Sequence, residues 1–436
     1  MGGVPGAVSG VQRVLVVEPS PELLRRAARA GFLVWSLADR GRRGGAHLRE
    51  VAGRSRGLLL VDTGDAPAVR GAVACAVREH GIAHVLNLGG VRTAGPVFAA
   101  AQDAGVAVNP AHTVEVLTDR GALRALLSPH PRLRVRARRA YGGAGVERAV
   151  AGFGGQAVVV RSARPGGPRR AELLRGQREV GRWRLGQGGG GQEPFVVEEY
   201  LPGPQYAVET LSVDGMHQVL GIIALETTGP PHFVTTTHLY PAPLAGRDEA
   251  AIRSAVCAVL DLAGFENGAV RTTVVHGPGG TPRVLACRPG LDRADHAARL
   301  VRLAGGADLE EAALRALTGE VPAAVPAGRS AVVGLVCGPP GDGAGDGAGG
   351  GSDGGGFDGG GFAGFGAGGG FGAGVLAGVR ELPCVAGVEV AGRGVSPGCA
   401  AHGHGLVAVV GAGARQALGH LAAARARLAG VGREVT

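Results

Sequence analysis

Short apolar runs alternate with helical segments over the first hundred residues of the chain. Buried strands are expected at Val11–Val17, Phe32–Leu37, Leu58–Val61 and His84–Leu88. Helices are expected at Pro21–Gly31, Pro67–Gly81 and Thr93–Gly105, the first two with proline at the start and glycine at the end. This alternation predicts a parallel, doubly wound α/β sheet. Ligands favour the carboxyl ends of such strands, which here include Glu18–Ser20 and Gly89–Thr93.

After Asp119 the pattern becomes strand-rich and is typical of an α+β arrangement. Arginines alternate with apolar residues over Arg132–Ala137, which predicts a strand with one basic face. The residues between Thr227 and Leu239 are expected to form a polar connection. Further strands are predicted at Ala157–Val160, Phe195–Glu198, Tyr206–Val213, Val219–Ala224, Ala269–Val275 and Arg283–Cys287, and helices at Asp248–Gly264, Asp295–Leu303 and Leu309–Leu317.

The last hundred residues contain a glycine-rich insert. The stretch from Gly341 to Gly374 holds 20 glycines in 34 residues, a composition typical of a flexible surface loop. On either side of it, Arg329–Cys337, Val388–Val390 and Leu406–Val410 predict strands, and Ala414–Leu428 predicts a helix.

The charge is uneven along the chain. All 45 basic residues are arginine, so chemistry that needs a lysine amine is excluded. The net charge is +9, yet residues 132–184 alone carry 14 arginines against three glutamates, or +11. Such a block attracts phosphates, and a solvated surface, a nucleotide-phosphate site and nucleic acid all remain open. The scarcity of aromatic residues and the lack of an RNA-binding or zinc-finger motif disfavour nucleic acid. No apolar stretch is long enough for a membrane span and no secretory signal is visible, so a cytoplasmic location without membrane contact is expected.

Two segments resemble the ATP-grasp superfamily, and within it the carboxylate–amine (amino-acid) ligases. They are VVEEYLPGPQYAVETLSVDGMHQVLGI (Val196–Ile222) and TTGPPHFVTTTHLYPAPL (Thr227–Leu244). The resemblance implies an ATP-grasp fold in four parts. They are a Rossmann-like pre-grasp domain (1–118), a lid subdomain (119–194), a second ATP-grasp subdomain (195–328) and a C-terminal accessory domain (329–436) that carries the insert.

The resemblance also implies a chemistry. In the family, two α+β lobes grip ATP, a carboxylate substrate attacks the γ-phosphate to form an acyl phosphate, and an amine then displaces phosphate. Mapped onto this chain, the resemblance places adenine and ribose along the hinge strand, at Glu198, Glu199 and Leu201, with Gln205 on the ribose side. Arg120 and Arg161 stand in place of the family's phosphate-binding lysines. Gly166 and Gly167 lie in the loop that covers the phosphates.

The metal-binding positions depart from the family. Thr273 and Ala286 stand where it carries the two metal-binding glutamates, and Arg288 stands for asparagine. Gly290 replaces the catalytic arginine, and Arg271 adds a further positive charge. Magnesium prefers oxygen ligands, so only the downstream Asp292 and Asp295 are candidates for binding it.

These observations leave two main hypotheses. The first is an ATP-dependent ligase that joins a small carboxylate or amino acid to an amine. The second is a non-catalytic ATP-grasp descendant that binds a nucleotide or a protein partner. ATP is the expected cofactor in the first, with magnesium in question, and no catalytic residue is assigned. Nucleic acid binding is a third and weaker alternative. The sequence does not fix the oligomeric state, and a homodimer is one of the alternatives.

Overall fold

The computed structural model describes most of the chain. The described residues are 12–41, 43–163, 171–186, 192–230, 233–277, 279–291, 297–340, 379–380, 382–391 and 402–430. The expected glycine-rich loop at 341–374 lies outside them. No helix in the described part is both long and apolar enough to cross a membrane.

The N-terminal lobe is a parallel sheet in the order β3-β2-β1-β4, as the alternation of apolar runs predicts. Its central strands are buried, and Leu15, Val17 and Leu37 lie in one apolar core with helix α3. Ser20 starts α1 because its hydroxyl accepts a hydrogen bond from the Leu23 amide, 2.9 Å away. The elements are β1 (Arg13–Val17), α1 (Pro21–Arg29), β2 (Leu33–Asp39), α2 (Gly45–Arg54), β3 (Gly57–Val61), α3 (Ala66–His80), β4 (His84–Asn87) and α4 (Val91–Asp103).

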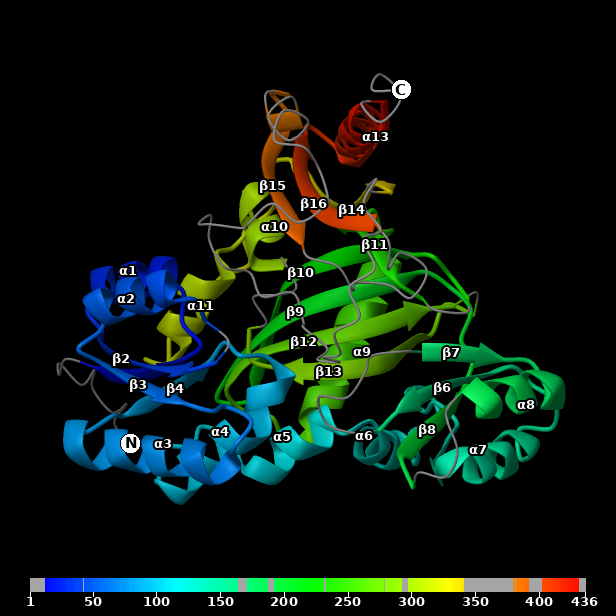
Figure 1. Ribbon diagram of the computed structural model, residues 1–436, viewed down its shortest axis with the longest axis horizontal. Coiled ribbons are helices and arrows are strands. Elements are labelled where there is room, and N and C mark those ends of the chain that lie inside the picture. Colours follow the sequence, from blue (N-terminus) through cyan, green and yellow to red (C-terminus); the bar gives the residue numbers. More distant parts are fainter. Residues whose placement is uncertain are drawn as a thin grey trace, which may run out of the picture.

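A small second sheet forms the lid lobe, at the lower right of Figure 1. Its strands run antiparallel in the order β5-β8-β6-β7, and α7 and α8 cover one face around Phe153, Trp183 and Phe195. Helices α5 and α6 connect the lid to the N-terminal lobe. The elements are α5 (Ala111–Thr118), α6 (Arg120–Leu127), β5 (Ala137–Tyr141), α7 (Gly142–Ala151), β6 (Val158–Ser162), β7 (Ala171–Leu174), α8 (Gln177–Gly186) and β8 (Pro194–Glu199).

An eight-stranded antiparallel sheet forms the centre of the molecule. Its order is β13-β12-β9-β10-β11-β14-β16-β15, so strands from both sides of residue 328 share one sheet. Helix α9 packs against β10, β12 and β13, and α13 packs against β14 and β16 at the top of Figure 1. The elements are β9 (Gln205–Val213), β10 (Met216–Thr227), β11 (Thr235–Tyr240), α9 (Gly246–Ala263), β12 (Gly268–His276), β13 (Pro282–Pro289), α10 (Ala297–Leu303), α11 (Leu309–Ala316), β14 (Ser330–Pro340), β15 (Val385–Ala391), β16 (His402–Gly411) and α13 (Ala414–Gly430).

Two sequence predictions in the middle of the chain are wrong. The expected basic strand at 132–137 is a turn followed by an irregular segment. The amides of Leu133 and Arg134 both donate to the His130 carbonyl, and β5 begins only at Ala137. The polar stretch after Thr227 contains β11, which pairs with the apolar strands β10 and β14. Alternation of arginine with apolar residues also arises where an irregular segment buries every second side chain, as Leu133 and Val135 are buried here.

Candidate active site

Glu198 lies at the end of β8 and is buried where the lid meets α6 and the central sheet. Its side chain faces three arginines from two elements, α6 and β6. Arg124 Nε donates to Glu198 Oε1 at 2.6 Å, Arg161 Nε lies 3.6 Å from Oε2, and Arg120 Nη1 lies 3.9 Å from the same oxygen. The structure therefore brings together the hinge carboxylate and both of the arginines predicted to bind phosphate.

Helix α6 holds two of these arginines on one face. Arg120 and Arg124 are four residues apart, the spacing that aligns side chains along a helix. Asp119 starts the helix and accepts a hydrogen bond from the Ala122 amide. Arg124 also donates to the carbonyls of Val284 and Leu285, at 2.8 and 2.7 Å, and is nearly fully buried. Arg124 therefore fixes Glu198 against β13.

The charge balance of this cluster is positive. Arg288 on β13 lies close enough to Arg120 and Arg161 to lower the pKa of both guanidinium groups. The described members are thus four arginines (Arg120, Arg124, Arg161, Arg288) and one carboxylate, Glu198. We call these five residues the arginine cluster. Arg288 has a further interaction of its own. The other three arginines still outnumber the carboxylate of Glu198, and such an excess of positive charge in a largely buried place favours binding of an anion.

The pKa shifts follow from burial and from this crowding. Burial favours the neutral acid of Glu198, but attraction to Arg124, Arg120 and Arg161 outweighs it and lowers the pKa of the carboxyl group. Burial, reinforced by repulsion from Arg161, lowers the pKa of Arg120 to about 9. Both groups are therefore charged at neutral pH.

Arg161 retains bonding capacity in this site. Its Nε atom is buried and makes no hydrogen bond to any residue that the structure describes. A buried donor without a hydrogen bond costs about 1–3 kcal/mol. An oxyanion placed beside it would satisfy this donor, so the cluster fits the phosphates of a nucleotide.

A second buried ion pair lies beside the positions at which the sequence resemblance predicts metal ligands. Arg271 Nε on β12 lies 2.5 Å from Glu209 Oε1 on β9. Glu209, Arg271 and Arg288 are directly opposite one another on three adjacent strands, so they form one row across the sheet. The next row on that face is Ala207, Thr273 and Ala286.

These rows do not fit a magnesium ion. Thr273 and Ala286 offer no carboxylate, and the one carboxylate of the row, Glu209, is bonded to Arg271. Within the described part of the chain, no three metal-ligating side chains come together. Asp292 and Asp295, the ligand candidates from the sequence, lie outside the described residues, as do Gly166 and Gly167.

Gly290, which the sequence resemblance aligns with a catalytic arginine, lies close to the backbone of another lobe. A Cβ atom on Gly290 would lie 2.9 Å from the Asn87 carbonyl oxygen, and the residue has a φ of +90°. Asn87 ends β4, where its side chain accepts from the Gly89 amide and the Thr93 hydroxyl. This carboxyl end of the N-terminal sheet therefore packs against β13 and leaves no room for a side chain at residue 290.

The other hinge residues lie near the lid edge. Glu199 Oε1 accepts the Arg136 amide at 2.8 Å, and Glu199 is half-buried. Leu201 follows β8 in the connection to β9, and Gln205 is the first residue of β9; both are half-buried. The structure does not bring Glu199 to the arginine cluster.

Sequence reasoning missed two residues of the site, Arg124 and Glu209. The spacing of the two arginines in the segment TDRGALR is a signal that could have found Arg124. Glu209 lies within an apolar strand, where a single carboxylate indicates a buried charge that needs a partner.

No family model matches the sequence, and no curated protein matches it. Solved structures do match. The L-amino acid ligase from Bacillus licheniformis superposes with a TM-score of 0.73 at 16% identity, covering 96% of this chain and 97% of that one. The ADP complex of N5-carboxyaminoimidazole ribonucleotide synthetase gives 0.68 at 10% identity, covering 97% and 98%. Biotin carboxylase from Campylobacter jejuni gives 0.63 at 11% identity, covering 95% and 91%.

Proposed function

We propose that this chain, which has the ATP-grasp fold, binds the phosphates of a nucleotide such as ATP through its arginine cluster, with ligase turnover slow or absent. The observation that carries the proposal is that three arginines face the carboxylate of Glu198 where the lid meets the central sheet: Arg124, which is buried, and Arg120 and Arg161, which are half-buried. In the solved structures with this fold, one contains ADP and another contains an ATP analogue.

The arginines of the cluster have different tasks in this proposal. Arg124 is held by two carbonyls and keeps Glu198 in place, so it is a positioning residue. Arg161 offers its unbonded Nε to a phosphate oxygen, and Arg120 adds charge beside it. Guanidinium groups bind phosphate as a planar fork, which suits this role.

Slow or absent turnover follows from the residues at the positions predicted to bind metal, because Thr273 and Ala286 carry no carboxylate. Phosphoryl transfer requires charge neutralisation across two phosphates, which an octahedral metal ion supplies by bridging them. Arg271 is bonded to Glu209 and cannot serve as such a bridge. Gly290 offers no guanidinium to the reacting carboxylate.

An active carboxylate–amine ligase is the second candidate. It is favoured by the likeness to the L-amino acid ligase over nearly the full length of both chains. Release of ADP during incubation with ATP and pairs of amino acids distinguishes the two candidates.

The binding proposal is tested by replacing Arg161. Arg161→Ala should weaken ATP binding at least about tenfold, the effect of about 1.4 kcal/mol. Arg182→Ala is the matched control, because Arg182 is exposed on α8 and outside the cluster. Equal affinity of both variants and the unchanged protein in calorimetry would contradict the proposal.

A further inference from the structure

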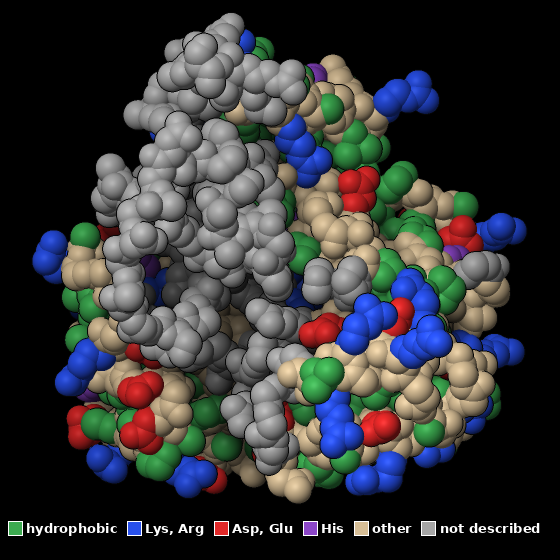
Figure 2. Space-filling view, turned by 45° about the vertical axis from the view of Figure 1, so that its right-hand side comes forward, with side chains coloured by type: hydrophobic (Ala, Val, Ile, Leu, Met, Phe, Trp, Pro, Cys, Tyr) green, Lys and Arg blue, Asp and Glu red, His purple; other side chains and the backbone are tan. Residues whose placement is uncertain are grey.

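A cavity lined by arginines lies against α6, next to the arginine cluster. It has a volume of about 570 Å³ and opens between α6 and the segment that leads into β5, the edge strand of the lid sheet. Gly121, Ala122 and Ala125 line it from the helix, and Arg134, Arg136 and Arg138 line it from the chain opposite. Figure 2 shows arginine side chains spread over the lid lobe that this view brings forward.

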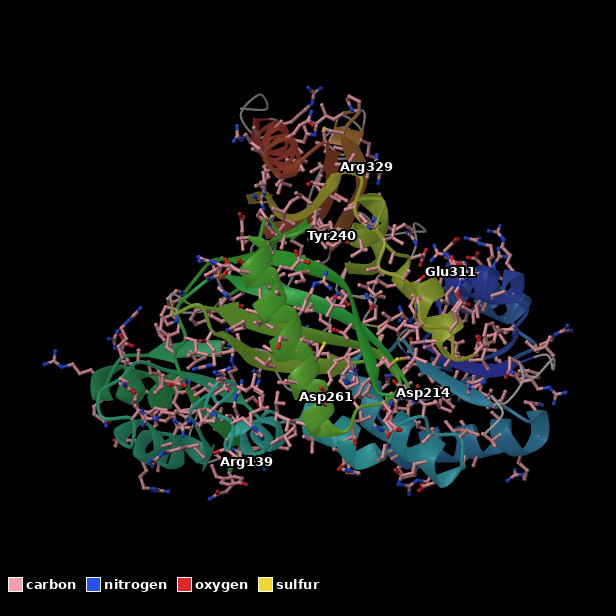
Figure 3. The ribbon with its side chains drawn as sticks, turned by 180° about the vertical axis from the view of Figure 1, so that it is seen from behind. Arg139, Asp214, Tyr240, Asp261, Glu311 and Arg329 are labelled. Atoms are coloured by element: carbon pink, nitrogen blue, oxygen red, sulfur yellow. The ribbon has the colours of Figure 1, made fainter. Side chains whose placement is uncertain are left out.

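The arginines of this cavity lack acidic partners. In the described part of the chain, no carboxylate lies within ion-pair distance of Arg134, Arg136 or Arg138. Arg139, at the same wall, pairs with Asp119, and Figure 3 shows Arg139 at the lower edge of the lid lobe. The wall therefore carries more positive charge than the protein itself neutralises.

One of these arginines is already held in place. The Arg136 guanidinium lies over the ring of Phe153, 5.0 Å from its centroid, and its Nη1 donates to Gln156 Oε1 at 2.8 Å. Its backbone amide is fixed by Glu199. A guanidinium that is oriented before a ligand arrives loses less entropy on binding.

Small residues on α6 keep the cavity open. Ala125 is exposed to it, and Gly121 faces the Arg139 guanidinium so closely that an added Cβ would overlap it. Val135, Phe153 and Val196 supply an apolar floor. A volume of this size is typical of sites for small molecules.

We propose that this cavity is a binding site for a small oligophosphate, either free or as part of a nucleotide, next to the arginine cluster and sharing Arg124 with it. The two sites are neighbours on α6, because Arg124 pairs with Glu198 and also lines the cavity. Arg120 faces Glu198, whereas Gly121 and Ala125 face the cavity. Three guanidinium groups without acidic partners match a ligand with several charged oxygens. A cavity of limited size with an apolar floor favours a small molecule over a nucleic acid backbone, which requires an extended track.

The test is calorimetric titration with tripolyphosphate. Ala125→Leu fills the cavity and keeps every charge, and leucine is a good helix former, so the helix should be retained. Arg136→Gln with Arg138→Gln removes charge and keeps the space. Both variants should bind tripolyphosphate at least about tenfold more weakly at one site. The control is Arg178→Gln with Arg182→Gln, two exposed arginines of α8, which should bind as the unchanged protein does.

Two further measurements distinguish binding in the cavity from binding at the arginine cluster. Arg161→Gln should leave the cavity site intact, so failure of the arginine cluster to bind anions would not remove this signal. Titration with ADP distinguishes a nucleotide from free oligophosphate. The proposal is overturned if both cavity variants bind tripolyphosphate as the control does. It is also overturned if a single-stranded RNA oligomer binds more tightly than tripolyphosphate and loses as much affinity in the α8 control variant as in the cavity variants.

Discussion

Replacing Glu198 by glutamine should both destabilise the protein and tighten its binding of anions. Glu198 is 2% exposed and is the carboxylate facing Arg124, Arg161 and Arg120 at 2.6, 3.6 and 3.9 Å. Each unit-charge attraction at about 4 Å amounts to about 4 kcal/mol near a protein surface, largely offset by the cost of burying the carboxylate. Removing one partner of a buried ion pair typically costs about 3–5 kcal/mol, and we expect a loss in this range for Glu198→Gln.

The same substitution removes a negative charge from the anion site. Phosphate should then bind at least about tenfold more tightly and should recover part of the lost stability, because a ligand that binds only the folded state stabilises it. Urea denaturation with and without phosphate measures both effects. Glu199→Gln is the control, since Glu199 is half-buried and outside the cluster. A Glu198→Gln variant as stable as the unchanged protein, or one that phosphate fails to stabilise further, would refute the reasoning.

Three further predictions concern the same site. Anion affinity should fall as the pH rises through about 9, because Arg120, whose pKa is lowered to about 9, then loses its proton; constant affinity up to pH 10 would count against this role. Gly290→Arg should restore no turnover, which ADP release measures. It should also lower the free energy of unfolding by about 1–3 kcal/mol, which thermal unfolding measures, because a left-handed backbone and a close backbone contact oppose any side chain there. Thr273→Glu and Ala286→Glu combined with Arg288→Asn should make ADP release depend on Mg²⁺, and a release rate unaffected by the metal would exclude these positions as ligands.

Much of the fold could be predicted because its signals are local. The parallel N-terminal sheet follows from apolar strands separated by helices with prolines at their starts, as at Pro21. The strand at Thr235–Tyr240 could not, because it begins with three consecutive threonines and so lacks an apolar alternation, and its partner strands lie on separate segments. Strand pairing of this kind is set by tertiary contacts and not by propensity.

The site was predictable only in part for a related reason. Motif positions pointed to Arg120, Arg161 and Glu198, which the structure brings together. The pairing of Glu209 with Arg271 depends on the register between β9 and β12, which no local pattern specifies. The contact of Gly290 with Asn87 likewise joins two lobes far apart in the sequence.

The most direct test of the central claim is titration of the protein with ATP, once with Mg²⁺ and once with the metal removed by a chelator. We predict binding in both conditions, with dissociation constants that agree within about threefold, because arginine side chains take the place of the metal's charge. ATP binding that appears only with Mg²⁺, accompanied by rapid release of ADP, would contradict this account and make the chain a metal-dependent enzyme.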